Sequence, residues 1–176
     1  TKISDYKNAL TDNTALIMKV HRSNFSIVGF TEEVGIDDLA SLSRDFGKPL
    51  FVDMGSGVPF DLGPSGIQGE WTIPMCLQQG ADIVSFSGDK VLGGPQAGII
   101  LGKTDFMETM ARHPFHRAIR ADKLTIAALA ATLRLLAQGR IDSIPVLRMI
   151  TEQISDVKKR AQRLMRLIKN HGPRIV

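Results

Sequence analysis

The amino-acid sequence predicts an α/β fold, in which a mostly parallel sheet carries helices on both faces. Along the first 102 residues, short apolar runs of strand length alternate with segments whose apolar side chains recur at helical spacing. Wholly apolar strands are typical of parallel sheets that helices cover. Polar side chains follow directly after several of these runs, at the edge where open α/β sheets bind ligands. The pattern therefore predicts both the fold class and the edge of the sheet that carries a site.

Helices and strands are expected to alternate up to residue 102. The clearest helix lies at residues 36–46, where the apolar spacing is helical and Gly47 suits the C-terminal end. The run at residues 50–52 is a short, fully apolar strand that we expect to end at Asp53. The other elements expected in this part are a helix at 3–10, a strand at 14–20, a short helix between Thr72 and Gly80, and strands at 81–86 and 97–102.

The chain beyond residue 102 is expected to be helical. Asp122 suits the N-cap of an alanine- and leucine-rich helix at residues 124–138, and Gly139 suits its end. A last helix is expected to run unbroken from Pro145 to about residue 170.

The charge of the chain is unevenly distributed. Residues 1–102 hold 7 Lys and Arg against 12 Asp and Glu, whereas residues 103–176 hold 15 against 6. A basic second half suits an acidic partner such as RNA, and it equally suits the solvated side of amphipathic helices. Both interpretations stay open at this level.

Composition excludes several classes of function. The apolar runs are far shorter than the roughly 20 residues that span a bilayer. The only cysteine, Cys76, excludes an internal disulfide and suits a reducing compartment, so we expect a cytoplasmic protein without a membrane partner. One cysteine and four scattered histidines give no ligand spacing for a metal.

Lys90 lies in the most distinctive stretch of the chain, a glycine-rich loop between two apolar strands. From Ser87 the sequence reads Ser-Gly-Asp-Lys-Val-Leu-Gly-Gly-Pro-Gln-Ala-Gly. Glycines at this density bring the backbone close to a ligand or to another segment. A loop lysine is ordinarily solvated, but this environment favours a ligand site.

Polar groups follow three strands at the same edge of the predicted sheet. A pyridoxal phosphate (PLP) site needs a lysine, a carboxylate against the pyridinium nitrogen, a donor to the ring hydroxyl oxygen, and groups that hold the phosphate. Taken singly, an asparagine here reads as a turn residue and a histidine as a core residue. Together, one residue is present for each role. The predicted cofactor-binding residues are Lys90, Asp53, Asn24, Ser87, His21 and Ser85, of which Lys90 and Asp53 are also predicted to be catalytic.

Five stretches of the chain resemble bacterial selenocysteine synthase, the L-seryl-tRNA(Sec) selenium transferase family. They are residues 19–25 (Lys-Val-His-Arg-Ser-Asn-Phe), 28–31, 53–57, 87–98 and 113–125, and the lysine loop is the most specific. The resemblance implies the type I fold of PLP-dependent transferases, that of the aspartate aminotransferase superfamily.

The resemblance also implies how the chain divides into domains. It covers most of residues 1–140 and becomes loose beyond Ser143. We therefore expect residues 1–143 to be part of the PLP-binding large domain and residues 144–176 to begin a smaller C-terminal domain. Because the chain starts at Thr1 without the family's N-terminal tRNA-binding domain and upstream cofactor segment, we expect it to be a piece of a longer protein.

Individual residues take roles from the resemblance. Lys90 is similar to the Schiff-base lysine, Asp53 to the pyridinium partner and Ser87 to the phosphate-binding serine. Arg117 and Arg120 match a pair thought to hold the anionic selenium donor, selenophosphate. Their spacing of three is expected to place them on one helical face. Without the family, a basic surface turn explains these two arginines equally well.

The implied activity is the conversion of seryl-tRNA(Sec) to selenocysteinyl-tRNA(Sec). The serine hydroxyl leaves to give an aminoacrylyl intermediate, to which selenium from selenophosphate adds. Lys90 takes the Cα proton, so its site is expected to favour the neutral amine. The family forms large homo-oligomers with shared sites, and the same is expected here.

Two alternatives remain. One is a PLP-dependent lyase of the same fold that acts on a small amino acid or amino sugar without tRNA. The other is a cofactor-free module for oligomerisation or RNA binding.

Overall fold

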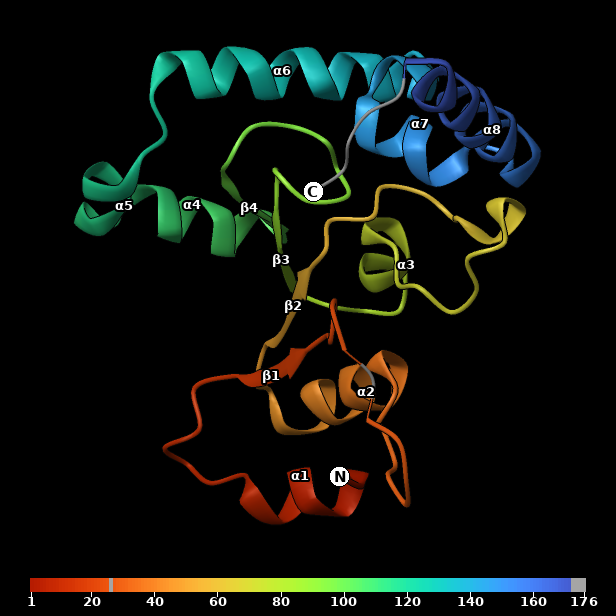
Figure 1. Ribbon diagram of the computed structural model, residues 1–176. Coiled ribbons are helices and arrows are strands. Elements are labelled where there is room, and N and C mark those ends of the chain that lie inside the picture. The colour runs from red at the N-terminus through yellow and green to blue at the C-terminus, as the bar shows by residue number, and fades with distance from the viewer. Residues whose placement is uncertain (26, 172–176) are drawn as a thin grey trace.

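A four-stranded sheet forms the centre of the computed structural model, which describes residues 1–25 and 27–171 (Figure 1). The strand order is β1-β2-β3-β4. The first three strands are parallel, and β4 runs antiparallel to β3. The strands are β1 (Ile17–Val20), β2 (Leu50–Gly55), β3 (Ile83–Ser87) and β4 (Gly98–Gly102).

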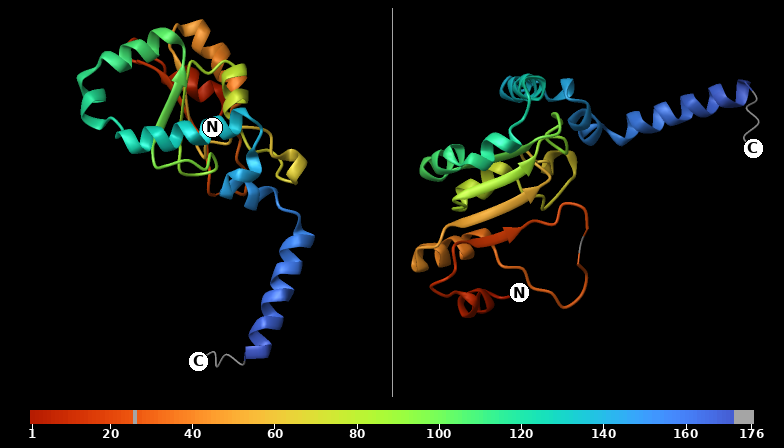
Figure 2. Two further views of the ribbon diagram at one scale, coloured as in Figure 1. Left: turned by 90° about the horizontal axis from the view of Figure 1, so that it is seen from above. Right: turned by 90° about the vertical axis from the view of Figure 1, so that its left-hand side faces the viewer.

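Helices occupy both sides of the sheet, as predicted. In Figure 1, α2 and α3 lie on one side of the strands, and α4 lies on the other side beside β4. Both views of Figure 2 show α8 extending away from the rest of the molecule. The helices are α1 (Ile3–Ala9), α2 (Ile36–Phe46), α3 (Ile73–Gln78), α4 (Thr104–Arg112), α5 (Pro114–Ile119), α6 (Lys123–Ala137), α7 (Pro145–Thr151) and α8 (Ile154–His171), with 3-10 turns at Gly63–Ser65 and Ile141–Ser143.

The main core lies between one face of the sheet and the pair α2 and α3. Apolar side chains that alternate along β2 and β3 are fully buried there, as the strand pleat requires. Burial in this core raises the pKa of the Cys76 thiol to about 11, so Cys76 is an inert core residue. The buried apolar residues of this layer include Leu39, Ala40, Leu42, Leu50, Val52, Met54, Cys76 and Val84.

The opposite face of the sheet is only partly covered, and we call it the open face. Met18 and Val20 of β1 lie on it with 45% and 55% of their surface exposed. Val20 pairs with Asp53 of β2, and Asp53 pairs with Ser85 of β3, which places all three side chains on this face. The register therefore puts the predicted carboxylate on the open face.

Helix ends confirm much of the local prediction. Gly47 ends α2 in the left-handed conformation, with φ at 60°. Thr72 caps α3 by accepting a hydrogen bond from the Met75 N–H, and Asp122 caps α6 by accepting from two N–H groups. Hydrogen bonds from the Thr125 hydroxyl and from the Thr125 and Leu124 N–H groups lower the pKa of Asp122.

Two boundaries differ from the prediction. The second strand continues to Gly55, so Asp53 lies within β2 and not at its end. The expected single C-terminal helix is two helices, because Glu152 adopts an extended backbone after α7. Ile144 and Leu147 are buried, so the packed part of the chain extends past residue 143, and the division into two domains stays a prediction.

Asp82, directly before β3, links the amino end of this strand to β2, α2 and α4. Its carboxylate accepts hydrogen bonds from the Leu50 N–H at 2.7 Å and the Ser43 hydroxyl at 3.4 Å, and it pairs with Lys103 at 2.5 Å. Burial alone would raise the pKa of Asp82, but the Lys103 ammonium and these donors outweigh it and lower the pKa. Asp82 thus ties the starts of β2 and β3 to the start of α4.

Replacing Asp82 by asparagine is expected to lower the free energy of unfolding by about 1–3 kcal/mol at pH 7, because the ion pair and the best acceptor are lost. A lowered carboxyl pKa contributes stability above its unfolded value of about 4, and this contribution disappears as the pH falls through the folded value. The free energies of unfolding of D82N and of the unmodified protein, measured in urea, should therefore become equal in acid. The exposed Asp12→Asn variant is the control, and an equal loss of stability at every pH would contradict the argument.

Candidate active site at the carboxyl ends of the strands

The loop that carries Lys90 connects β3 to β4 and is closed by its own backbone. The Gly88 N–H donates to the Ala97 carbonyl at 2.8 Å, and the Gly94 N–H donates to the Gly88 carbonyl at 2.7 Å. The Gly93 N–H donates to the Lys90 carbonyl at 3.0 Å. Lys90 itself is exposed. The loop is thus internally ordered while its lysine side chain remains accessible.

A tight glycine turn after Asp53 brings the end of β2 against this loop. Gly55 and Gly57 have φ values of 70° and 69°, which favour glycine. A Cβ on Gly57 would lie only 2.6 Å from the Ser87 carbonyl oxygen. A Cβ on Gly55 would lie 4.0 Å from the Lys90 Nζ, so the amino group reaches the end of β2. The close approach at Gly57 and the position of Lys90 Nζ near Gly55 thus place the lysine loop against the strand that bears Asp53.

Asp53 is oriented by its neighbour on β3. The Ser85 hydroxyl donates a hydrogen bond to Asp53 Oδ1 at 2.7 Å, and the two residues are register partners. This bond fixes the carboxylate on the open face of the sheet. Of the predicted site residues, the structure brings Lys90, Asp53 and Ser85 to one region.

His21 points to the other side of the sheet. Its ring stacks on Trp71 with centroids 4.5 Å apart, and its Nε2 lies 3.3 Å from Glu70 Oε1. Since Val20 shares the open face with Asp53, the adjacent His21 side chain belongs to the covered face. The structure thus places His21 in a packed polar cluster and separates its side chain from Asp53.

An ion-pair cluster around the buried Lys19 lies beside His21 and was not predicted from the sequence. Lys19 is 7% exposed, donates to Glu33 at 2.7 Å and lies 5.5 Å from the Trp71 ring centre. Arg22 pairs with the other oxygen of Glu33 at 2.5 Å. The hydrogen bond from Lys19 is the main cause of the lowered pKa of Glu33. A lysine within an otherwise apolar strand was the signal that could have indicated this cluster.

Asn24 and Ser87, the remaining predicted cofactor residues, are more exposed than Asp53 and Ser85 or lie at the end of a strand. Asn24 is exposed in the loop after β1, and the neighbouring Ser23 hydroxyl would lie 3.3 Å from a Cβ on Gly55. Ser87 is half-buried at the end of β3, three residues before Lys90.

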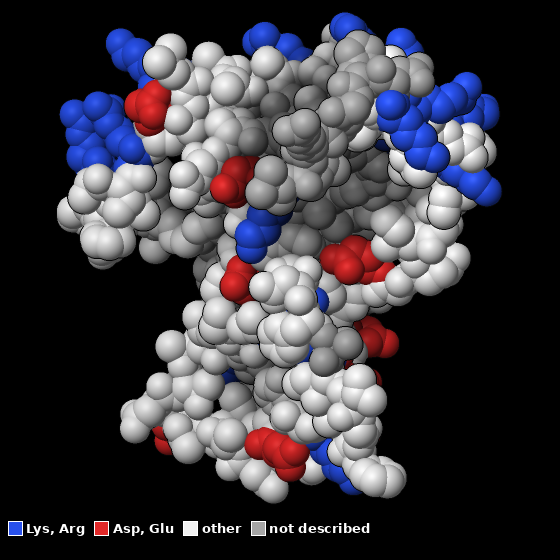
Figure 3. Space-filling model, in the orientation of Figure 1, with Lys and Arg blue, Asp and Glu red and all other residues white. Residues whose placement is uncertain are grey.

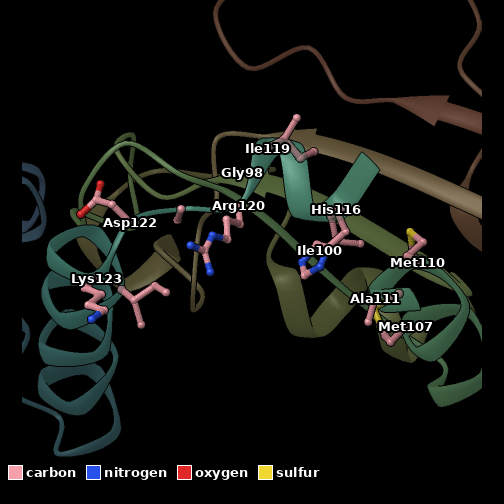
Figure 4. Close-up of a pocket in the computed structure, with 12 residues that line it drawn as sticks. Gly98, Ile100, Met107, Met110, Ala111, His116, Ile119, Arg120, Asp122 and Lys123 are labelled. Atoms are coloured by element: carbon pink, nitrogen blue, oxygen red, sulfur yellow. The ribbon is translucent and has the colours of Figure 1, made fainter. Parts of the chain in front are cut away.

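Arg120 lines a hollow of about 800 Å³ between β4 and the helices α4, α5 and α6. Figure 4 shows its guanidinium and the ring of His116 reaching into this space. α5 ends at Ile119, and Arg120 has an extended backbone. The expectation that Arg117 and Arg120 share one helical face is therefore wrong, and Arg117 does not line the hollow.

The Arg120 hollow opens on the same face of the sheet as Asp53. Ile100 lines the hollow and is the register partner of Ser85, which donates to Asp53. Lys90 and Asp53 do not line it. The open face thus carries a carboxylate over β2 and β3 and a guanidinium beside β4.

Basic side chains gather on the part of the molecule built from α4 to α8, as the sequence predicts. Figure 3 shows lysine and arginine mainly over this upper part, while acidic side chains are scattered over the upper, middle and lower parts of the face. This distribution is compatible with an RNA partner and with a solvated helical surface, so both interpretations stay open.

The part of the chain that the structure describes contains neither a helix that could span a membrane nor a cluster of metal ligands. Its helices are too short or too polar to cross a bilayer. Within the same residues, three or more His, Cys, Asp or Glu side chains do not come together as metal ligands.

Solved structures with the same arrangement define the class of fold. The structure of D-glucosaminate-6-phosphate ammonia-lyase aligns with a TM-score of 0.59 and 21% identity, over 78% of this chain and 33% of that one. The structure of metB from Corynebacterium glutamicum aligns with a TM-score of 0.50 and 23% identity, over 77% and 32%. These similarities confirm the predicted α/β fold, which this chain shares with those two proteins.

Sequence comparison then identifies the family. Residues 1–174 match the family SelA, L-seryl-tRNA selenium transferase. The L-seryl-tRNA(Sec) selenium transferase of Carboxydothermus hydrogenoformans is 52% identical over 94% of this chain, and that of Aquifex aeolicus is 47% identical over 97%. The chain belongs to the L-seryl-tRNA selenium transferase family. It spans 36% and 38% of the length of these two relatives.

The close approach at Gly57 gives a test of the site's geometry. Gly57→Ala is expected to lower the free energy of unfolding by about 2–4 kcal/mol, because the methyl group meets a backbone oxygen and φ is positive. Gly66→Ala is the matched control, since its φ is also positive but its Cβ meets open space; about 1 kcal/mol is expected. Denaturant unfolding measures both. Equal losses in the two variants would show that the contact with Ser87 is unimportant.

Proposed function

We propose that the protein containing this chain converts seryl-tRNA(Sec) to selenocysteinyl-tRNA(Sec), with PLP as cofactor and selenophosphate as selenium donor. Family membership supports the reaction. The observation that carries the proposal is the approach of the Lys90 amino group to the end of β2, the strand that bears Asp53. This is the pairing of amine and carboxylate that a PLP enzyme requires.

The residues present fit PLP. Gly55 leaves room beside Lys90 Nζ that a Cβ would fill, and Ser85 occupies only one of the two carboxylate oxygens of Asp53. Lys90 would hold the cofactor covalently, Asp53 its ring nitrogen, and Ser87 its phosphate. PLP, when bound, supplies an electron sink for the bond changes at the substrate Cα.

The side chains of this chain have separate tasks in the proposal. Lys90 holds and moves the proton of the substrate Cα. The Ser85 hydroxyl orients the Asp53 carboxylate, which keeps the ring nitrogen protonated. Asn24 would donate to the ring hydroxyl oxygen of bound PLP. His21 orders the end of β1 through its backbone N–H, which donates to the Asp53 carbonyl at 2.8 Å.

Arg120 and Arg117 hold the anionic donor in this proposal. Arg120 brings five N–H donors into a hollow otherwise lined largely by apolar side chains. A guanidinium in such a setting suits a phosphate-like anion. Arg117 lies in the last turn of the adjacent α5.

Assembly and location belong to the same proposal. We infer a cytoplasmic homo-oligomer, supported by large apolar side chains exposed on the loop after β1: Phe25, Ile27, Val28 and Phe30.

A lyase that acts on a small amino acid or amino sugar is the second candidate, favoured by the fold shared with the ammonia-lyase. Production of selenocysteinyl-tRNA from seryl-tRNA(Sec) and selenophosphate separates the two. Cofactor binding without that product, together with ammonia release from a small amino acid, would favour the lyase. A cofactor-free RNA-binding module would show RNA binding and no cofactor absorbance.

Replacing Lys90 by alanine is expected to abolish the visible absorbance of lysine-bound PLP and to lower turnover by at least about 10³-fold. The reason is that both the covalent attachment and the base are lost. Absorbance spectra and single-turnover product formation measure these effects. The exposed Lys7→Ala variant is the control. Retention of the absorbance in K90A would exclude Lys90 as the attachment site.

Replacing Arg120 by alanine is expected to raise the KM for selenophosphate by about tenfold or more, because a charge-assisted contact to the anion is lost. The cofactor absorbance should stay unchanged. Arg112→Ala is the control, since Arg112 pairs with Glu108 on the surface of α4. An unchanged donor KM in R120A would remove Arg120 from the anion site.

A further inference from the structure

Glu70 connects two elements of the site at a single carboxylate oxygen. Its Oε1 accepts a hydrogen bond from the Ser56 hydroxyl at 3.1 Å and lies 3.3 Å from His21 Nε2. Ser56 belongs to the turn after β2, and His21 follows β1. Glu70 itself lies in the irregular segment before α3.

Ser56 transmits this contact to the lysine loop. It is 4% exposed, and its carbonyl oxygen accepts a hydrogen bond from the Val91 N–H at 3.0 Å. Val91 directly follows Lys90. The path from Glu70 to the backbone of the lysine therefore consists of two hydrogen bonds and one buried residue.

The stacked rings of His21 and Trp71 lie on the other side of the Glu70 carboxylate. The His21 ring stacks on Trp71, which directly follows Glu70 in the chain. The backbone N–H of His21 donates a hydrogen bond to the Asp53 carbonyl. Only 11% of the His21 side chain is exposed. Glu70 is consequently fixed by groups that also fix the end of the strand carrying Asp53.

We propose that Glu70 is a positioning residue, which holds Ser56 and thereby sets the place of Lys90 relative to Asp53. It acts from the covered face of the sheet, opposite the Asp53 carboxylate, so it does not touch cofactor or substrate. The inference rests on the proposed function in one respect, namely that Lys90 is the residue that bonds the cofactor.

Hydrogen exchange of the cofactor-free, full-length protein tests the positioning directly. Glu70→Ala is expected to speed the exchange of backbone amides in residues 88–94 about tenfold, since a charge-assisted hydrogen bond is lost. Glu70→Gln keeps an acceptor for Ser56 and should restore most of the protection. Glu32→Ala is the matched control, because Glu32 makes only surface contacts with the N-terminal residues.

A double-mutant cycle tests the path through Ser56. Ser56→Ala alone should speed exchange of the same loop, and adding Glu70→Ala should bring little further change. Additive effects would show that Glu70 acts by another route. Faster exchange throughout the sheet in E70A would show a general structural role and would also overturn the proposal.

Covalent trapping links the loop to the chemistry. The protein is incubated with PLP and reduced with borohydride, and mass spectrometry gives the rate at which Lys90 is modified. That rate should fall about tenfold in E70A, stay near the unmodified value in E70Q, and be unchanged in E32A. An unchanged rate in E70A would overturn the positioning role. Absence of modification at Lys90 in the unmodified protein would instead overturn the proposed function, while the exchange data would still decide whether Glu70 orders the loop.

Discussion

The contact between the turn after β2 and the loop after β3 is the constraint on which the site depends. Gly57 packs so closely on the Ser87 carbonyl that any side chain would overlap it, and the Ser56 carbonyl holds the Val91 N–H. These are contacts of backbone to backbone, so they fix the loop without using the side chains of Lys90 and Asp53. Lys90 can therefore remain exposed on a loop whose main chain is ordered.

Sheet register determines which polar groups can act together. Because Val20, Asp53, Ser85 and Ile100 pair across four strands, their side chains share the open face. The same alternation sends Lys19 and His21 to the covered face, where they form ion pairs and a ring stack. The alternation of side chains thus separates the His21 side chain from Asp53, while register places Asp53 on the same face as a hollow whose Arg120 lies 67 positions later in the chain.

Much of the fold and part of the site could be predicted from the sequence, because short-range physics decides them. Apolar strand runs, the Gly47 and Asp122 helix ends and the strand-end position of Lys90 all depend on local spacing. Glu70 and Ser56 could not be found in this way, since their partners are 14 or more residues distant and lie in turns without a periodic pattern. The termination of α5 before Arg120 was also hidden, because the segment 117–120 has no glycine or proline to signal it.

In the proposed function, Lys90 and Arg120 can act only when the open face of the sheet is covered. A base must be neutral and an anion-binding guanidinium is strongest out of water, and both conditions need a low local dielectric. Lys90 and Arg120 are exposed among the described elements, and apolar side chains such as Met18 and Val20 lie bare on the same face. A cofactor, a further segment or a second copy that covers this face would bury those apolar groups and remove water from the lysine and the arginine together. In the proposed function, covering this face would therefore couple the burial of its apolar side chains to the removal of water from Lys90 and Arg120.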